Sequence, residues 1–251
     1  MTLRKLDDII RTSMRKKIVN WIRAQVKQAK AKGIVLGLSG GLDSSVVLAL
    51  AKEAVGKKMV LALILPCTSQ KQDLKDAQLV AKKLGVIAKT IDLSKICRDL
   101  SQVLPKANKL AVANLKPRLR MLMLYYFANK LNYLVCGTGN KSEIRVGYFT
   151  KFGDGAADIL PIGDLLKMQV RKLAKELGIP SQVIAKPPTA GLWHGQTDEG
   201  EMGISYLELD DILGRLEKKK KHILSSEKVN KVKVMIKRSE HKRQGPKVCY
   251  I

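Results

Sequence analysis

The chain has 251 residues, with 47 Lys and Arg against 22 Asp and Glu, and a formal net charge of +25. Its length suits one large α/β domain or two small ones, and an apolar content of 45% excludes a disordered or fibrous protein. The longest apolar run, residues 59–65, is too short to cross a bilayer, and the N-terminus lacks the apolar core of a signal peptide. The four cysteines are scattered, without a CxxC pair, which argues against a disulfide framework or a zinc site. We therefore expect a soluble, cytoplasmic protein with no membrane partner.

The high positive charge is typical of a nucleic-acid-binding protein, but its distribution argues against that function. Residues 1–32 carry +8 and residues 215–247 carry +10, which leaves only +7 for the rest of the chain. Lys outnumbers Arg by 35 to 12, whereas proteins that read phosphates and bases favour Arg. We interpret the excess as a lysine-rich solvated surface and expect no nucleic-acid partner. A nucleic-acid groove, or a field that attracts small anionic ligands, remains the alternative.

The spacing of apolar residues predicts strands that alternate with helices along the first half of the chain. Helices are expected over 3–30, 44–55, 70–84 and 111–131, and strands over 34–38, 58–65, 86–91 and 133–136. A polar stretch precedes the helix over 111–131, residues 137–162 are rich in loops, and further helices are expected over 164–177, 206–214 and 226–241. This alternation predicts a doubly wound parallel α/β sheet with helices on both faces, as in Rossmann-like proteins. No linker or repeat divides the chain, so we expect one domain over residues 1–251.

The sharpest motif is 36-LGLSGGLDSS-45, which lies between a predicted buried strand and a predicted helix. Its glycine pair allows close backbone approach, its serines supply hydroxyl groups, and the helix N-terminus offers free N–H groups to phosphate. The motif lacks the lysine of a Walker loop and does not match GxGxxG. Asp43 in the first turn would repel phosphate unless Mg²⁺ bridged the two groups. The alternative is that the aspartate and serines only cap the helix.

The pattern SGGxDS in this position resembles the loop of the N-type ATP pyrophosphatases. These enzymes cleave ATP between the α and β phosphates and activate a carbonyl oxygen as its adenylate. The resemblance implies their adenine nucleotide alpha-hydrolase-like fold.

Further segments narrow the resemblance to the ammonia-dependent NAD synthetases, and they occur in that family's order. These segments are 114-NLKPRLRM-121, 137-GTGNKSE-143, 147-GYFTKFGDGAADILPI-162, 186-KPPTAGLWHGQTDE-199 and 240-EHKR-243. The resemblance runs from about residue 33 to residue 247. It implies a ligase that adenylates deamido-NAD with ATP, releases pyrophosphate, and then uses ammonia to displace AMP and form NAD. Related enzymes add an N-terminal glutaminase domain, for which this chain leaves no room, so free ammonia is the implied nitrogen donor.

The resemblance also implies functional residues, carried over position by position. Asp43 and Glu143 would bind Mg²⁺, and Lys167 would stabilise negative charge during catalysis. The ATP site would be formed by Gly37, Leu38, Ser39, Gly40, Gly41, Leu42, Asp43, Ser44, Thr138, Lys167 and Thr189. Deamido-NAD would be bound by Arg118, Lys151, Asp158, His241 and Lys242. Without the resemblance, we would expect Glu143 to be a surface carboxylate and Lys167 to be a solvated lysine one turn into its helix.

Two further features follow from the pattern. Residues 187–203 combine paired prolines, glycines and an acidic cluster, and we expect a mobile cover that closes over ATP and excludes water. An ordinary surface loop is the alternative. The helix over 111–131 has a broad apolar face. The resemblance implies that this helix lies in a homodimer interface, although such a face is more often part of a core.

Other functions fit the residues less well. A GMP-synthetase-like or tRNA-modifying pyrophosphatase shares SGGxDS but does not account for GYFTKFGDG together with KPPTAGLW. A zinc hydrolase is disfavoured, because no two of His194, His222 and His241 have a metal-binding spacing. A non-catalytic nucleic-acid-binding protein would rest only on the two basic ends of the chain.

Overall fold

The computed structural model describes residues 3–193, 195–218 and 227–250, with the backbone alone for residues 3–13. The strands are β1 (Gly33–Gly37), β2 (Val60–Ile64), β3 (Ile87–Thr90) and β4 (Tyr133–Val135). The helices of the first half are α1 (Leu3–Gln28), α2 (Leu42–Val55), the 3-10 turn η1 (Lys57–Met59), α3 (Lys71–Leu84), α4 (Ser94–Val103), α5 (Lys109–Ala113) and α6 (Leu115–Leu131). Those of the second half are α7 (Lys141–Val146), α8 (Lys167–Glu176), α9 (Ser181–Ala185), α10 (Asp198–Met202), α11 (Tyr206–Glu217), α12 (Glu227–Arg238) and α13 (Glu240–Arg243).

The four strands form one parallel sheet in the order β3-β2-β1-β4. The chain moves outward from β1 to β3 and then returns to the other side of β1 with β4, which confirms the predicted doubly wound sheet. The point where the strand order reverses lies between β1 and β4. In sheets of this kind, ligands bind at the carboxyl ends of the strands beside that point.

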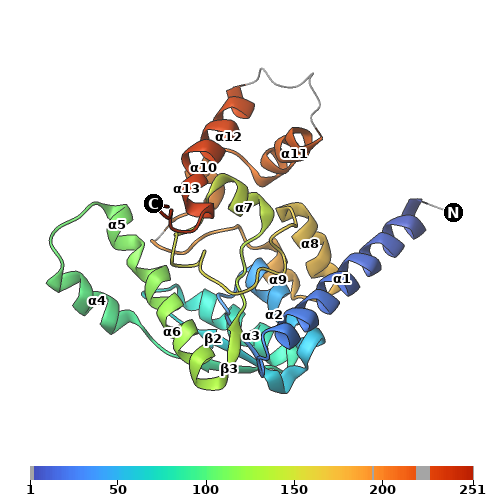
Figure 1. Ribbon diagram of the computed structural model, residues 1–251, viewed down its shortest axis with the longest axis horizontal. Coiled ribbons are helices and arrows are strands. Elements are labelled where there is room, and N and C mark those ends of the chain that lie inside the picture. The colour runs from blue at the N-terminus through green and yellow to red at the C-terminus, as the bar shows by residue number, and fades with distance from the viewer. Residues whose placement is uncertain (1–2, 194, 219–226, 251) are drawn as a thin grey trace.

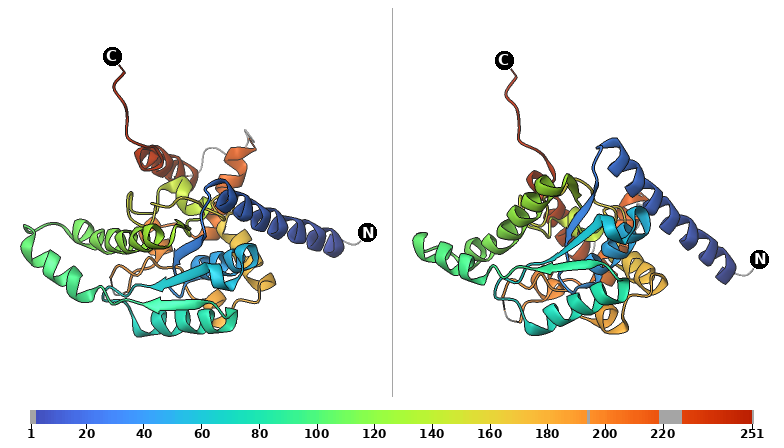
Figure 2. Two further views of the ribbon diagram at one scale, coloured as in Figure 1. Left: turned by 60° about the horizontal axis from the view of Figure 1, so that its bottom comes forward. Right: turned by 90° about the horizontal axis from the view of Figure 1, so that it is seen from below.

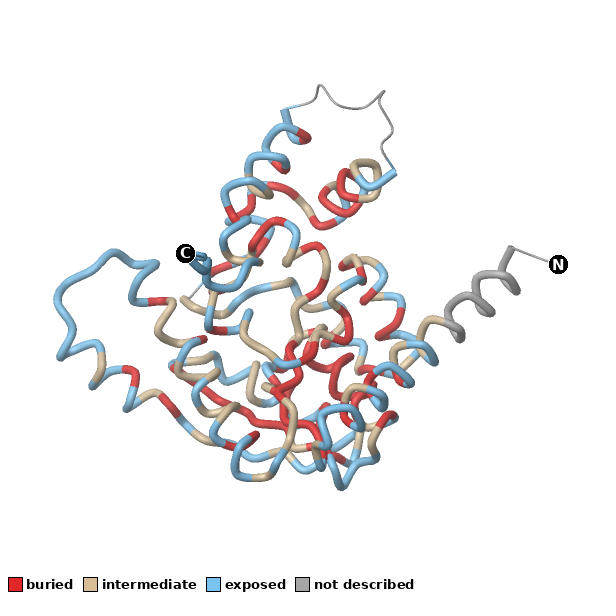
Figure 3. The backbone as a smooth tube through the Cα atoms, viewed as in Figure 1, coloured by how far each residue is buried: buried red, intermediate tan, exposed pale blue. Residues whose placement is uncertain are grey.

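Helices cover both faces of the sheet, as predicted (Figures 1 and 2). Ile34 and Leu36 of β1 point into a core shared with α1, α2, α3 and α8, whereas Val35 between them points into a second core with α4 and α6. This alternation follows from the two-residue period of a strand. Figure 3 shows many of the buried residues in the centre of the molecule, where β1, β2 and α2 are mostly buried. Both faces are therefore anchored, and the carboxyl ends of the strands are held rigidly.

A third apolar cluster lies apart from the sheet and packs α10, α11 and α12, which we call the helical cap, against α7. Its core includes Met202, Tyr206, Leu209, Leu213 and Val232. Figure 1 places the helical cap above the α/β body, next to α7 and α8. Side chains from the cap can therefore reach the carboxyl end of the sheet.

The predicted helix over 111–131 is divided at Asn114 into α5 and α6. Pro117 has no N–H to donate to the carbonyl of Ala113, and this interrupts the helical hydrogen bonds there. The polar stretch before it contains α4, which buries only Cys97. The predicted helix over 226–241 becomes α12 and α13, and its first residue lies outside the described residues.

The loop-rich stretch 137–162 contains the short helix α7, which single-residue preferences do not indicate. A reciprocal capping box between Asn140 and Glu143 stabilises this helix. Within the described residues, no helix is long and apolar enough to cross a membrane.

Candidate functional site

A cavity of about 560 Å³ opens at the carboxyl ends of the strands, where the sheet meets the helical cap and residues 186–198. Fifteen of the seventeen predicted site residues line it. On one side these are Gly37, Leu38, Ser39, Gly41, Leu42, Asp43, Ser44, Thr138, Glu143, Lys167 and Thr189, and on the other Arg118, Lys151, His241 and Lys242. Gly40 and Asp158 are not among the lining residues.

Residues 37–44, which we call the glycine loop, join β1 to α2. The Ser39 and Ser44 hydroxyl oxygens lie 3.0 Å apart, and the Ser39 N–H donates to Ser44 Oγ at 3.2 Å. Gly41 is the N-cap of α2, and no side chain caps this helix end. The first N–H groups of α2 are therefore left for a ligand in the cavity, where a helix N-terminus favours negative charge.

Gly40 allows the glycine loop to pack closely against α3. Its φ angle is +79°, and a Cβ atom placed on it would lie 2.3 Å from the carbonyl oxygen of Asp73 in α3. Both the left-handed backbone and the close approach require glycine at this position. The structure therefore gives Gly40 a conformational role, and any direct contact with ATP stays a prediction.

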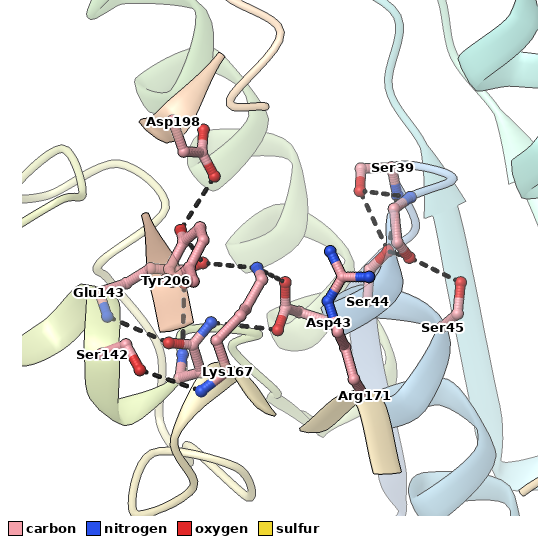
Figure 4. A network of polar contacts seen from close by, with 12 residues as sticks. Ser39, Asp43, Ser44, Ser45, Ser142, Glu143, Lys167, Arg171, Asp198 and Tyr206 are labelled. Carbon is pink, nitrogen blue, oxygen red and sulfur yellow. Dashed lines mark hydrogen bonds and ion pairs between the residues drawn. The ribbon is translucent and has the colours of Figure 1, made fainter. Parts of the chain in front are cut away.

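Asp43, Glu143 and Lys167 meet at one point of the cavity and form what we call the lysine–carboxylate cluster (Figure 4). Lys167 Nζ donates to Asp43 Oδ2 at 2.6 Å and to Glu143 Oε1 at 3.0 Å. The amide of Asn140 donates to Asp43 Oδ1 at 3.1 Å. The three elements α2, α7 and α8 thus bring two distant carboxylates to one ammonium group. The solvated lysine expected from composition is wrong, because Lys167 is only 2% exposed.

The helical cap extends the lysine–carboxylate cluster. The Tyr206 hydroxyl lies 3.1 Å from Glu143 Oε1 and 3.0 Å from Asp198 Oδ2. Its ring also faces Lys167, with Nζ 4.8 Å from the ring centroid. Asp198 and Tyr206 are both buried. Two carboxylates therefore contact the ammonium group, and the third, Asp198, is joined to them through the Tyr206 hydroxyl.

Burial and neighbouring charges shift the pKa values of the lysine–carboxylate cluster in opposite directions. Burial raises the pKa of Glu143 to about 7, although Lys167 beside it acts to lower that pKa. Burial likewise raises the pKa of Asp198. Burial alone would lower the pKa of Lys167, but Asp43 and Glu143 outweigh it and raise the pKa, so this lysine stays charged. The binding of a further cation at this site is therefore electrostatically favourable.

The N-terminus of α8 is fixed by buried polar groups from the cap side. The Lys167 N–H donates to Ser142 Oγ at 2.9 Å, and the Met168 N–H donates to Asp210 Oδ2 at 2.8 Å. Ser142 in turn donates its hydroxyl to Asp210. These contacts satisfy two N–H groups that a helix leaves free and hold the Lys167 backbone in place.

Basic residues form the other side of the cavity. Arg118 Nη2 donates to the Lys151 carbonyl at 3.4 Å, and Lys151 Nζ donates to the His241 carbonyl at 2.6 Å. Lys242 Nζ donates to the carbonyls of Gly147 and Phe149, at 2.8 and 2.9 Å. All these bonds are to neutral carbonyl groups, so the positive charges remain to attract an anionic ligand.

Two predicted residues have their polar atoms engaged within the protein. Asp158 Oδ2 accepts from the Val135 N–H at 2.7 Å, and its Oδ1 accepts from the Tyr125 hydroxyl at 3.2 Å. The Thr189 hydroxyl donates to the Gln196 carbonyl at 2.8 Å inside residues 187–203. Asp158 thus ties the end of β4 to the following loop, and its contact with a substrate stays a prediction.

Residues 187–203, the predicted cover, line the cavity on the side of α5 and α6. Lys116 Nζ donates to the Leu192 carbonyl at 2.6 Å, and Lys109 Nζ lies 4.2 Å above the Trp193 ring. His194 lies outside the described residues, as does His222. The contacts place this segment across the cavity, and its movement stays a prediction.

Sequence reasoning missed several residues that shape the site, and their signals differ. Asn140 was detectable, because NKSE before a short helix matches a capping box. Tyr206 and Asp198 come from the helical cap, far along the chain, and nothing local indicates that they meet Glu143. Arg171 and Lys186 also line the cavity, but a single lysine or arginine in a basic chain carries no signal.

The model of the NAD synthase family matches residues 14–246. The NH(3)-dependent NAD(+) synthetase of Archaeoglobus fulgidus is 50% identical over 237 residues, which cover 94% of this chain and 95% of that protein. The enzyme of the same name from Methanocaldococcus jannaschii is 48% identical over 242 residues, covering 92% and 93% of the two chains.

Two solved structures are similar over the whole molecule. An NMN synthetase from Francisella tularensis has a TM-score of 0.88 and 38% identity, and the match covers 96% of this chain and 99% of that one. An NH3-dependent NAD synthetase from Campylobacter jejuni has a TM-score of 0.83 and 30% identity with the same coverage. Together with the geometry of the cavity, these matches show that the chain belongs to the NAD synthase family.

Proposed function

We propose that this protein is an ammonia-dependent NAD synthetase, a ligase that converts deamido-NAD, ATP and ammonia into NAD, AMP and pyrophosphate. The observation that carries this proposal is one cavity that joins an uncapped glycine loop and the lysine–carboxylate cluster to a wall of basic residues. The first side suits the phosphates of ATP, and the second suits an anionic dinucleotide. The enzymes named above catalyse, by their names, an ammonia-dependent synthesis of NAD.

In the first step, an oxygen of the nicotinate carboxylate attacks the α-phosphorus of ATP, and the bond to the β-phosphate oxygen breaks. The N–H groups at the start of α2 and the serines of the glycine loop hold the departing pyrophosphate. Lys167, fixed by two carboxylates and the capped end of α8, faces the reacting phosphates with little reorganisation. Arg118, Lys151, His241 and Lys242 orient deamido-NAD.

We propose that Asp43 and Glu143 hold Mg²⁺ together with the phosphates. The donors fit this ion, because both are carboxylates and because the two together carry more negative charge than Lys167 neutralises. Among the described residues, no three His, Cys, Asp or Glu side chains form a metal site by themselves. That agrees with Mg²⁺, which commonly uses one or two carboxylates and completes its shell with phosphates and water. When bound, the ion would neutralise phosphate charge.

In the second step, ammonia attacks the carbonyl carbon of the adenylate, the bond to AMP breaks, the nitrogen loses one proton, and NAD forms. A mixed anhydride of this kind is easily hydrolysed, so the site must exclude water. Residues 187–203 lie across the cavity and are tied to α5 and α6 by Lys109 and Lys116. We propose that this segment covers the bound adenylate.

One observation favours a second substrate. The structure with a TM-score of 0.88 is called an NMN synthetase, which suggests amidation of the mononucleotide, whose acid form lacks the adenylate half of deamido-NAD. The two substrates share the nicotinate ribotide, so the lysine–carboxylate cluster would serve both.

The two functions are separated by competition. Purified protein is incubated with ATP, Mg²⁺, ammonium and equal concentrations of deamido-NAD and nicotinate mononucleotide, and NAD, NMN, AMP and pyrophosphate are measured. We expect NAD to dominate, in equal amounts with AMP and pyrophosphate. Predominant NMN would establish the second function, and the release of ADP would contradict both.

We also propose a homodimer that buries the outer faces of α4, α5 and α6. Figure 2 shows α4 and α5 projecting from the body beside α6, and Figure 3 shows most of this segment exposed. Leu122 and Tyr126 of α6 are 60% and 55% exposed, and Val103 and Leu110 are 78% and 58% exposed. Large apolar side chains that gather exposed on neighbouring helices typically mark an interface. Leu110 also lines the cavity, so a partner there would adjoin the site.

The dimer is tested with the double variant Leu122→Glu/Tyr126→Glu, which places two charges one helical turn apart on this face. Light scattering coupled to gel filtration is expected to give twice the chain mass of 27.8 kDa for the natural protein and 27.8 kDa for the variant. Leu207→Glu, at a 66% exposed leucine of α11, is the matched control and should stay dimeric. A monomeric natural protein would refute the dimer.

Two remaining predictions stay proposals. We propose a cytoplasmic location, which the free state of Cys67, Cys97, Cys136 and Cys249 supports, because oxidising compartments favour disulfides. We also propose that residues 1–251 act as one synthetase domain. The cavity that the sheet and the helical cap build together supports the single unit.

A further inference from the structure

We propose that Arg171 is a phosphate-binding residue, whose guanidinium group contacts the β- and γ-phosphates of ATP and then the departing pyrophosphate. This inference rests on the proposed function and adds a residue to its ATP site. Arg171 lies on α8 one turn after Lys167, and it lines the same cavity as Ser39, Asp43 and Ser44.

The charge balance of the cavity is the first argument. ATP brings several negative charges to the glycine loop, and Lys167 is already neutralised by Asp43 and Glu143. Lys186 is neutralised in the same way by Asp73 and Asp76, at 2.6 and 2.8 Å. Within the described part of the chain, no carboxylate lies within 4.0 Å of the Arg171 nitrogens. Arg171 therefore brings a positive charge that no described acid cancels.

The position of the side chain is the second argument. Its Nη1 donates to the Ile184 carbonyl of α9 at 3.0 Å, which anchors one edge of the guanidinium group. Asp43 and Ser44 line the same cavity as this group, and Figure 4 draws no ion pair to it. The anchor fixes a planar group whose other N–H donors make no hydrogen bond to the part of the chain that the structure describes. Arginine in this state suits the bidentate recognition of phosphate oxygens.

If Arg171 had only a structural role, different results would be expected. The bond to Ile184 joins α8 to α9, which directly precedes residues 186–198 of the cavity wall. If Arg171 served only this contact, its loss would weaken the binding of every ligand and lower stability. A phosphate role instead concentrates the effect on ATP and pyrophosphate. It also allows rescue by a small guanidinium compound, which restores the charge without restoring the bond to α9.

The experiment measures Mg–ATP and Mg–pyrophosphate binding by calorimetry, together with the KM for deamido-NAD. Arg171→Ala is compared with Arg171→Lys and with Lys172→Met, an exposed neighbour on α8 that does not line the cavity. We expect Arg171→Ala to weaken both phosphate ligands by about 10- to 100-fold. Arg171→Lys should recover part of this loss, added guanidinium should improve the Ala variant, and the KM for deamido-NAD should change less than threefold.

The outcomes separate this inference from the proposed function. Equal affinities for pyrophosphate in the natural protein and Arg171→Ala would overturn the inference while leaving the enzyme intact. So would an equal loss for all ligands without guanidinium rescue, since that is the structural result. Failure of the natural protein to bind Mg–ATP would instead refute the proposed function.

Discussion

Replacing Lys167 with methionine is expected to cause the largest loss, in both activity and stability. The substitution leaves Asp43 and Glu143, whose side chains are only 17% and 16% exposed, without the buried ammonium group that both now contact. Removing one partner of a buried ion pair costs about 3–5 kcal/mol of unfolding free energy. Removing a fixed charge that faces the reacting phosphates costs about 100- to 1,000-fold in rate. Denaturant unfolding and pyrophosphate release measure the two effects.

Lys172→Met is the control for Lys167→Met, because it removes an exposed lysine from the same helix. This control should match the natural protein in both measurements. If Lys167→Met keeps a rate within threefold of the natural protein, Lys167 has no role in charge stabilisation. If it unfolds at the same denaturant concentration, the buried ion pair contributes nothing to the fold.

The amide variants Asp43→Asn and Glu143→Gln are expected to lose activity while keeping the fold. Each retains the size of the side chain, and Lys167 still contacts the other carboxylate. Each variant also removes one of the surplus negative charges around Lys167, so unfolding free energies should stay within about 1 kcal/mol of the natural value. A lost Mg²⁺ ligand should raise the Mg²⁺ concentration needed for half-maximal rate by about 10- to 100-fold.

Asp211→Asn is the matched control for these variants, since the ion pair of its carboxylate with Arg215 on α11 is exposed. Its Mg²⁺ dependence should be unchanged. If both Asp43→Asn and Glu143→Gln need the same Mg²⁺ concentration for half-maximal rate as the natural protein, Asp43 and Glu143 are not metal ligands, even if the rates of the variants fall.

Much of the α/β body could be predicted from the sequence, because its elements carry strong local signals. The buried strands around Ile34 and Leu63 are short apolar runs. They are followed by the apolar helix α2 and by α3, which has helical periodicity. The predicted and observed elements differ where the local sequence signal is weaker. The helix α4 buries one residue, and the break at Asn114 depends on the proline three residues later. Such breaks follow from one missing hydrogen bond rather than from a pattern.

The site could be predicted where one motif carries several functional groups. The glycine loop joins a strand to a helix, so its position at the carboxyl end of the sheet follows from the fold. The burial of Lys167 could not be predicted, because it results from Asp43 and Glu143, which lie 124 and 24 positions away. The same holds for Tyr206, which reaches Glu143 only because the helical cap packs on α7.

The proposed function requires that the protein forms an adenylate on the carboxylate of the nicotinate substrate. Deamido-NAD labelled with ¹⁸O in both carboxylate oxygens tests it most directly, with ATP, Mg²⁺ and ammonium and mass spectrometry of the products. Attack by the carboxylate on the α-phosphorus, followed by displacement by ammonia, predicts one ¹⁸O in each AMP, one in each NAD amide and none in pyrophosphate. Unlabelled AMP, or label in a released phosphate, would contradict the account.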